Sequence, residues 1–230
     1  MLITPFVAEG GPTRKALTPL TVVGLGCNTA GSALAHWGRW RTAFATIATT
    51  TVTFAVEPVG VRTGRPFGRY DYRQARQPQL AGVPVAVPLA WFSMAVPARE
   101  VAHAALGSQS TALSWIFGGA IALTAWDLFL DPQMTREGYW SWHRKGRYRG
   151  IPATNLFAWL ATGLVVMGII EVVLPAGRPS GALVTQYGAV GVMEAAAFAT
   201  FFDDRLVAIA GSVAMLPVAA VAVARLVAAS

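Results

Sequence analysis

The chain has 230 residues, of which 54% are hydrophobic and only 13% are charged, with a mean hydropathy of +0.49. A soluble domain carries about twice that charged fraction, and a disordered chain is far more polar. The formal net charge of +7 would fit nucleic-acid binding, but the positions of the basic residues argue against it. The composition predicts an integral membrane protein.

Seven segments are long and apolar enough to predict membrane-spanning helices, because a span needs roughly 20 mostly apolar residues. In chain order, the predicted spans are residues 17–35, 41–58, 82–98, 111–131, 154–174, 183–202 and 206–226. The first two are diluted by threonine and glycine and are the weakest. We find no internal repeat. We therefore expect an all-α polytopic transmembrane bundle of about seven spans, forming a single integral membrane domain over residues 1–230.

The basic residues are distributed unevenly across this predicted topology. Of the 18 lysines and arginines, 13 fall at the N-terminus and in the loops after the second, fourth and sixth spans. The positive-inside rule then places the N-terminus and both long basic loops in the cytoplasm, with the protein in the plasma membrane. This asymmetry explains the net charge without a nucleic acid, and it makes the lipid bilayer, with its anionic headgroups, the expected partner.

Polar side chains gather at the predicted cytoplasmic ends of four spans. Glu57 ends the second span, Asp127 and Asp131 end the fourth, Asn155 begins the fifth, and the acidic pair 203–204 follows the sixth. Ionisable groups at membrane depth are unfavourable, so each is a candidate for function. We expect these groups to meet in the cytoplasmic third of the bundle.

Asp127 and Asp131 are four residues apart and share one helix face. In apolar surroundings their mutual repulsion favours one of them holding a proton, which suits a general acid. The alternative for Asp131 is a purely structural one, in which it ends the helix before Pro132 in contact with loop arginines.

Two loops at the same end are rich in aromatic residues. The first carries Phe67, Arg69, Tyr70 and Tyr72, and the second carries Tyr139, Trp140, Trp142 and Tyr148. These side chains could cover a cavity and bond its carboxylates, or they could form the aromatic belt found at membrane interfaces. The sequence leaves both interpretations open.

At the opposite end, Arg99, Glu100 and His103 are expected in a solvated helix end or loop. Glu171 is expected to reach the interface or to pair with Arg178. Glu194 lies well inside the sixth predicted span. It needs a partner or a proton, and serves either packing or a site.

Several kinds of chemistry lack their residues. Three scattered histidines and the single Cys27 predict no metal site and no disulfide. The sequence contains no phosphate-binding loop, dinucleotide fingerprint or nucleophile elbow. We expect a reaction that uses acid–base groups in an apolar cavity, without a metal or organic cofactor.

Three blocks of sequence resemble the membrane carotenoid-biosynthesis hydratase family, which comprises bisanhydrobacterioruberin hydratase and γ-carotene 1′-hydroxylase-like enzymes. They are residues 63–72 (TGRPFGRYDY), residues 125–134 (AWDLFLDPQM) with the following GYW at 138–140, and residues 148–152 (YRGIP) continuing to Asn155 and Trp159. The blocks come in the family's order, and the resemblance covers roughly residues 55–175. The family implies no cofactor and provides no settled catalytic assignment.

The resemblance implies an isoprenoid (terpenoid) enzyme, a lyase that adds water across the terminal 1,2 double bond of an acyclic (ψ-end) carotenoid. Protonation of that alkene would give a tertiary cation, which needs a nearby anion and one positioned water. Our sequence-based hypothesis makes Asp127 the acid and Asp131 its charge partner, with Glu57 or Asn155 holding the water and Tyr70 and Tyr72 capping the carboxylates. The candidate substrate-binding residues are Phe67, Arg69, Tyr70, Tyr72, Trp126, Tyr148, Asn155 and Trp159. The acyclic carotenoid is the expected substrate, and other membrane enzymes of the carotenoid pathway are candidate partners.

Three other functions remain open from the sequence. A carotenoid cyclase or isomerase would use the same cation. A UbiA-type prenyltransferase would use the Asp127–Asp131 spacing to bind a magnesium diphosphate, although it requires a second aspartate-rich motif for which residues 203–204 are a poor substitute. A non-enzymatic carotenoid carrier would release its ligand unchanged.

Overall fold

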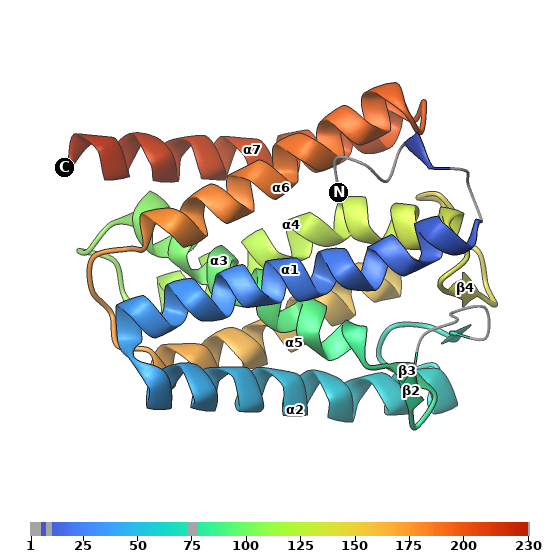
Figure 1. Cartoon of the computed structure of the whole chain (residues 1–230), viewed down its shortest axis with the longest axis horizontal. Coiled ribbons are helices and arrows are strands. Elements are labelled where there is room, and N and C mark those ends of the chain that lie inside the picture. Colours follow the sequence, from blue (N-terminus) through green and yellow to red (C-terminus); the bar gives the residue numbers. More distant parts are fainter. Residues whose placement is uncertain (1–5, 8–10, 73–77, 230) are drawn as a thin grey trace.

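The computed structural model describes residues 6–7, 11–72 and 78–229, and these form seven α-helices that run side by side (Figure 1). The helices are α1 (Pro12–Trp37), α2 (Arg39–Thr63), α3 (Ala86–Leu106), α4 (Ala112–Arg136), α5 (Ala153–Val173), α6 (Gly181–Thr200) and α7 (Arg205–Ala228). Each of the seven predicted segments corresponds to one of these helices. The predicted all-α bundle is therefore confirmed.

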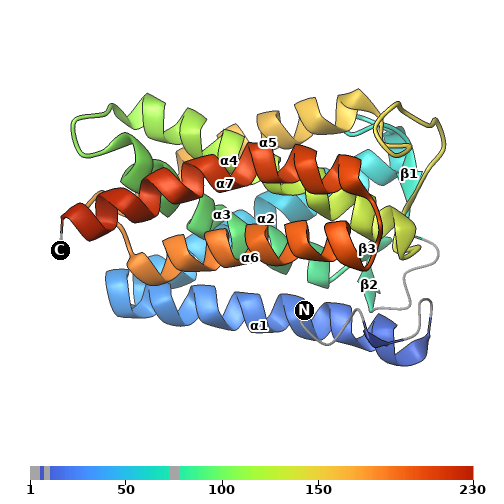
Figure 2. The ribbon, with the colours of Figure 1, turned by 90° about the horizontal axis from the view of Figure 1, so that it is seen from above.

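Helix α3 is the centre of the bundle and packs against all six other helices (Figure 2). Every residue from Trp91 to Ala104 is buried. A helix buried on all sides has no polar face and no lipid-facing stripe. Its Pro97 has no backbone N–H, so the carbonyl of Ser93, one turn earlier, lacks its helical donor. Thr29 Oγ1 at 3.0 Å and Gln186 Nε2 at 2.9 Å bond that carbonyl instead, which ties α1 and α6 to the central helix.

Five of the described helices, α2, α4, α5, α6 and α7, are long and apolar enough to cross a membrane. Helices α1 and α3 do not reach the same hydropathy. Helix α3 is surrounded by other helices rather than by lipid. It can therefore carry polar residues, because protein groups can bond them. The prediction of seven helices is thus confirmed, whereas the predicted count of about seven membrane spans is not, because five of the described helices qualify as spans.

Two loops meet at one end of the bundle and pair with each other. Strand β1 (Tyr70–Asp71) pairs antiparallel with β4 (Ser141–Trp142), placing Tyr70 opposite Trp142. A small hairpin of β2 (Gln79–Leu80) and β3 (Val83–Pro84) leads into α3. Gly60 on α2 permits the close approach of the first loop, because a Cβ there would lie 2.9 Å from both the Phe67 ring and the Tyr70 hydroxyl.

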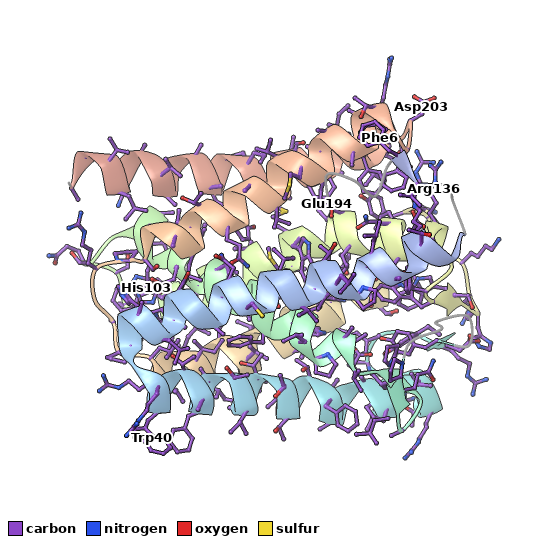
Figure 3. All side chains as sticks on the ribbon, viewed as in Figure 1. Phe6, Trp40, His103, Arg136, Glu194 and Asp203 are labelled. Atoms are coloured by element: carbon purple, nitrogen blue, oxygen red, sulfur yellow. The ribbon has the colours of Figure 1, made fainter. Side chains whose placement is uncertain are left out.

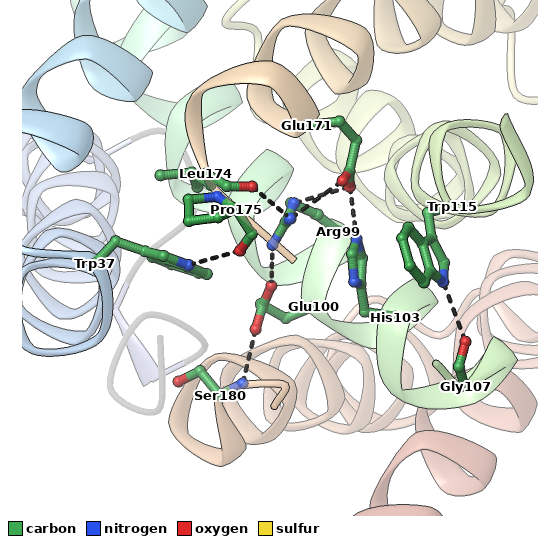
Figure 4. Close-up of polar contacts among 10 residues, drawn as sticks. All are labelled: Trp37, Arg99, Glu100, His103, Gly107, Trp115, Glu171, Leu174, Pro175 and Ser180. Carbon is green, nitrogen blue, oxygen red and sulfur yellow. Dashed lines mark hydrogen bonds and ion pairs between the residues drawn. The ribbon is translucent and has the colours of Figure 1, made fainter. Parts of the chain in front are cut away.

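At the opposite end, Arg99 lies in a buried polar cluster and only 1% of its surface is exposed (Figure 4). Its guanidinium bonds Glu100 Oε1 at 2.6 Å, Glu171 Oε1 at 2.8 Å and the carbonyl of Leu174 at 2.8 Å. His103 Nε2 lies 2.6 Å from Glu171 Oε1. The expectation of a solvated helix end was wrong: α3 continues to Leu106 and turns these side chains inward.

The cluster fastens α3 to α5 and to the start of α6. Glu100 Oε2 accepts a hydrogen bond from the backbone N–H of Ser180 at 2.7 Å. The His103 ring stacks on Trp115, with centroids 4.2 Å apart. Glu171 therefore pairs with Arg99 and His103 rather than with Arg178, its predicted partner, which is exposed.

The orientation in the membrane follows only from the charge distribution and can be tested by cysteine labelling. In a Cys27→Ser background, we expect Arg178→Cys to react with a membrane-impermeant thiol reagent in intact cells. Arg144→Cys, in the loop between α4 and α5, should react only after the cells are permeabilised, because the positive-inside rule places that loop in the cytoplasm. The opposite labelling pattern would reverse the predicted orientation.

Candidate active site

A cavity lies beneath the paired loops at the end of the bundle where α2 and α4 finish and α5 begins. Its floor is polar and its walls are mainly aromatic and aliphatic. The lining residues are Thr18, Val22, Glu57, Phe67, Tyr70, Tyr72, Pro84, Ala86, Val87, Ala90, Trp91, Leu130, Asp131, Met134, Tyr139, Trp140, Trp142, Asn155 and Trp159.

The Asn155 side chain connects the two aspartates of α4. Its amide nitrogen donates to Asp127 Oδ2 at 2.9 Å and also to Asp131 Oδ2. Because one nitrogen atom bonds both carboxyl groups, the two groups lie together at the cavity floor. Asp131 lines the cavity, whereas Asp127 lies behind it, 1% exposed, with its Oδ1 buried and without a hydrogen-bond partner.

Glu57 faces the same cavity from α2 and is bound by two phenols of the first loop. The hydroxyls of Tyr70 and Tyr72 both donate to Glu57 Oε2, the latter at 2.8 Å. Burial, together with the adjacent Glu57 carboxyl group, raises the pKa of both phenols above their ordinary value. Both tyrosines therefore stay protonated and remain hydrogen-bond donors over the whole physiological pH range.

The described lining of the cavity offers the carboxyl groups no basic side chain. Among the described residues that line the cavity, none is a lysine, arginine or histidine. The alternative role for Asp131, in which it ends the helix in contact with loop arginines, does not match this arrangement, because α4 continues through Asp131 and Pro132 to Arg136. Glu57 and Asp131 thus face one largely apolar cavity, and among the described residues the donors to the carboxyl groups are amide, phenol and indole groups.

Tryptophan rings form the wall that faces the carboxyl groups. Trp91 of α3 stacks on Trp159 of α5, with centroids 4.0 Å apart and an angle of 12° between the rings. Trp126 meets Trp159 edge to face. Trp140 and Trp142 close the cavity from the second loop, and Trp140 packs edge to face on Tyr72. The aromatic residues of the two loops therefore cover a cavity, as one of the two interpretations predicted.

Most of the residues singled out from the sequence meet in this cavity. Those that line it are Glu57, Phe67, Tyr70, Tyr72, Asp131, Asn155 and Trp159. Trp126 instead borders a neighbouring cavity. Arg69 is exposed and does not border the site, since a guanidinium in a surface loop remains solvated.

Tyr148 lies outside the cavity for a reason that can be read in the sequence. Pro132 has no N–H, so the carbonyl of Leu128 lacks its helical donor. The Tyr148 hydroxyl donates to that carbonyl at 2.7 Å. Tyr148 therefore completes the hydrogen bonding of α4 next to the aspartates.

Sequence reasoning missed Trp91. It lies in a continuous apolar segment in which no spacing distinguishes a cavity wall from a packed core. Across the parts of the chain that the structure describes, no group of three histidine, cysteine, aspartate or glutamate side chains is arranged to hold a metal ion.

Comparison with known proteins adds a family to this geometry. The family model described as "Carotenoid biosynthesis protein" matches residues 18–228. The chain belongs to that family. It is also similar to the bisanhydrobacterioruberin hydratase of Haloarcula japonica, at 31% identity over 133 residues, which cover 57% of this chain and 45% of that protein. No solved structure matches the chain.

Membership of the carotenoid biosynthesis family agrees with the resemblance seen in the sequence, and the apolar helices of the described residues agree with a membrane protein. The matched region covers less than half of the Haloarcula japonica protein.

Proposed function

We propose that this protein is a carotenoid hydratase, which adds water across the terminal 1,2 double bond of an acyclic carotenoid. The observation that carries the proposal is the cavity floor, where Glu57, Asp131 and Asn155 lie under an aromatic wall with no basic side chain among the described lining residues. The similarity to a protein named as a hydratase supports the same class of reaction.

The Asp127–Asp131 pair is the proton source in this proposal. Two carboxyl groups bonded to the same amide nitrogen disfavour a second negative charge, so the pair holds one proton between them. Asp131 borders the cavity, whereas the buried Asp127 does not and is connected to Asp131 by the Asn155 amide. We therefore assign Asp131 as the group that delivers the proton and Asp127 as its charge partner, which reverses the roles expected from the sequence.

The reaction balances with water as the only second reactant. The Asp131 proton forms a bond to C2 at the expense of the 1,2 double bond, which leaves a tertiary cation at C1. The faces of Trp91, Trp140 and Trp159 stabilise this cation, since aromatic rings attract positive charge. A water molecule held at Glu57 forms the C1–O bond. The proton that this water releases passes through Glu57 back to Asp131, which restores the starting state of the carboxyl groups.

The tyrosines orient Glu57 for this step. Both phenols bond the same oxygen, Oε2, and so fix the plane of the carboxyl group beneath the cavity. The water is thereby directed to one face of the cation. An apolar wall limits the number of other water molecules that enter.

The function is tested by expressing the full chain in cells that accumulate an acyclic carotenoid and analysing the extracted pigments by mass spectrometry. The proposal predicts a product heavier by about 18 mass units, with one tertiary hydroxyl group. A product of unchanged mass and altered structure would indicate a cyclase or isomerase. Bound carotenoid that is recovered unaltered would indicate a carrier.

Replacement of the two tyrosines should lower turnover without abolishing it. We expect Tyr70→Phe and Tyr72→Phe each to reduce kcat about tenfold, because each removes one hydrogen bond to a charged or partly charged acceptor. Since the pKa of both phenols is raised, the wild-type protein should lose no activity to tyrosine ionisation between about pH 8 and about pH 10. Initial rates measured over that range test both expectations, and a fall that disappears in the Phe variants would contradict the second.

A further inference from the structure

A second cavity forms a slot between α1 and α6 with α4 as its floor. Helices α1 and α6 make little contact with each other, although both pack against α3. Val192 and Phe201 on the rim of the slot are exposed, at 57% and 46%. The slot therefore opens sideways from the bundle, where an apolar ligand could enter from a membrane.

The slot and the acid cavity share a wall. Thr18 and Val22 of α1, Ala90 of α3, and Leu130 and Met134 of α4 border both. The shared wall holds no ionisable and no aromatic side chain. The unbranched Met134 side chain changes rotamer readily, so this wall can yield to a narrow chain. The end of a linear hydrocarbon can pass from the slot to the carboxyl groups through it.

Glu194 is the exceptional residue of the slot. It lies on α6 between the two ends of the bundle (Figure 3), is 3% exposed, and its Oε2 is buried without a hydrogen-bond partner among the described residues. Arg14, the basic residue among the described lining, is bonded to Glu137 at 2.5 Å and lies over the Phe202 ring. A buried carboxyl oxygen that accepts no hydrogen bond is unfavourable unless a ligand donates one to it.

We propose that the slot is the site through which the hydroxylated chain end leaves the acid cavity, and that Glu194 binds the hydroxyl group of that product. The inference rests on the proposed function for the identity of the ligand, an acyclic carotenoid with a tertiary alcohol at one end. The hydrocarbon substrate has no group that Glu194 can bond. The product has one, and it is formed directly behind the shared wall.

This arrangement makes Glu194 a specificity-determining residue rather than a catalytic one. One hydrogen bond to a buried carboxyl group favours the alcohol over the hydrocarbon in the slot. The same hydrogen bond to Glu194 replaces one that the new hydroxyl group makes to water in the acid cavity and loses on leaving it. The chain end is thus drawn toward the lateral opening after the reaction and not before it.

The test is equilibrium binding of two probes to the full chain in lipid nanodiscs. The probes are lycopene and its 1-hydroxy-1,2-dihydro derivative, and each is recovered and checked by mass after the measurement. In an Asp131→Asn background, we expect the alcohol to bind about tenfold more tightly than lycopene. Glu194→Leu should bring the ratio of the two dissociation constants close to one while leaving lycopene binding unchanged. Glu194→Gln should retain part of the preference.

An unchanged ratio in Glu194→Leu would overturn the assignment of Glu194. Retained lycopene binding shows that the variant is folded, so a loss of preference cannot be attributed to misfolding. The result is separable from the proposed function: absence of hydrated product with the wild-type chain would refute the hydratase, whereas the binding ratio depends on the slot alone.

A second pair of variants locates the binding site. Ala197 borders the slot, and Ala199, on the same helix, is exposed and does not. We expect Ala197→Phe to weaken the binding of both probes at least tenfold, because the ring fills the slot, and Ala199→Phe to leave both unchanged. Equal binding of both probes by the Ala197→Phe and wild-type chains would show that the carotenoid does not use the slot.

Discussion

Asp131→Asn should abolish hydration, lowering kcat by a factor of roughly 10² to 10⁴, because the amide cannot supply the proton. Carotenoid binding should persist, since the replacement keeps the shape of the side chain at the cavity floor. Product formation from an acyclic carotenoid and pigment retained by the purified protein measure the two properties separately.

The matched control is Asp203→Asn. Asp203 is exposed and has a left-handed backbone, with φ of 47°, which asparagine adopts as readily as aspartate. It should therefore leave turnover unchanged. Asp127→Asn should also lower turnover, but less than Asp131→Asn, because Asp127 acts on the proton through its neighbour. Full hydration by the Asp131→Asn variant would refute the acid assignment.

Arg99→Met should destabilise the protein by roughly 3–5 kcal/mol, because it leaves the buried Glu100 without its countercharge and leaves Glu171 with His103 alone. The unfolding temperature of the purified protein, measured in one detergent for all variants, reports the effect. Activity at a permissive temperature should survive, since the cluster lies at the end of the bundle away from the carboxyl cavity.

The control for Arg99 is Arg178→Met. Arg178 is exposed and was the partner for Glu171 expected from the sequence. Its replacement should change the unfolding temperature little. A large loss of stability for Arg178→Met together with a small one for Arg99→Met would mean that the polar cluster around Arg99 is paired differently from the arrangement in Figure 4.

The helices and the place where acidic groups gather could be predicted because both depend on local patterns. Apolar segments of span length locate helices, and alternating helix directions bring Glu57, Asp131 and Asn155 to one end. The prediction that a loop rich in tyrosine covers the site also depended on its position directly after α2. Residue type and order along the chain carry all of this information.

Long-range pairing could not be predicted in the same way. The third predicted span stopped at residue 98 because charged residues follow it, whereas α3 continues to Leu106. Those charges are tolerated because Glu171, on another helix, faces Arg99. Likewise, the fact that Asp131 rather than Asp127 borders the cavity depends on how α4 is rotated against α5, and two residues one turn apart give no indication of that rotation.

The Asn155 amide also decides where the proton of the aspartate pair can sit. A primary amide nitrogen only donates, so each Oδ2 that it contacts must offer a lone pair. The proton of the pair is consequently favoured on the oxygens that Asn155 does not contact, because a carboxyl O–H oxygen is a weaker acceptor than a carboxylate oxygen. A neutral side chain thus helps to determine which carboxyl oxygens carry the proton. An Asn155→Asp variant would lose both donated hydrogen bonds and, with them, this preference in the position of the proton.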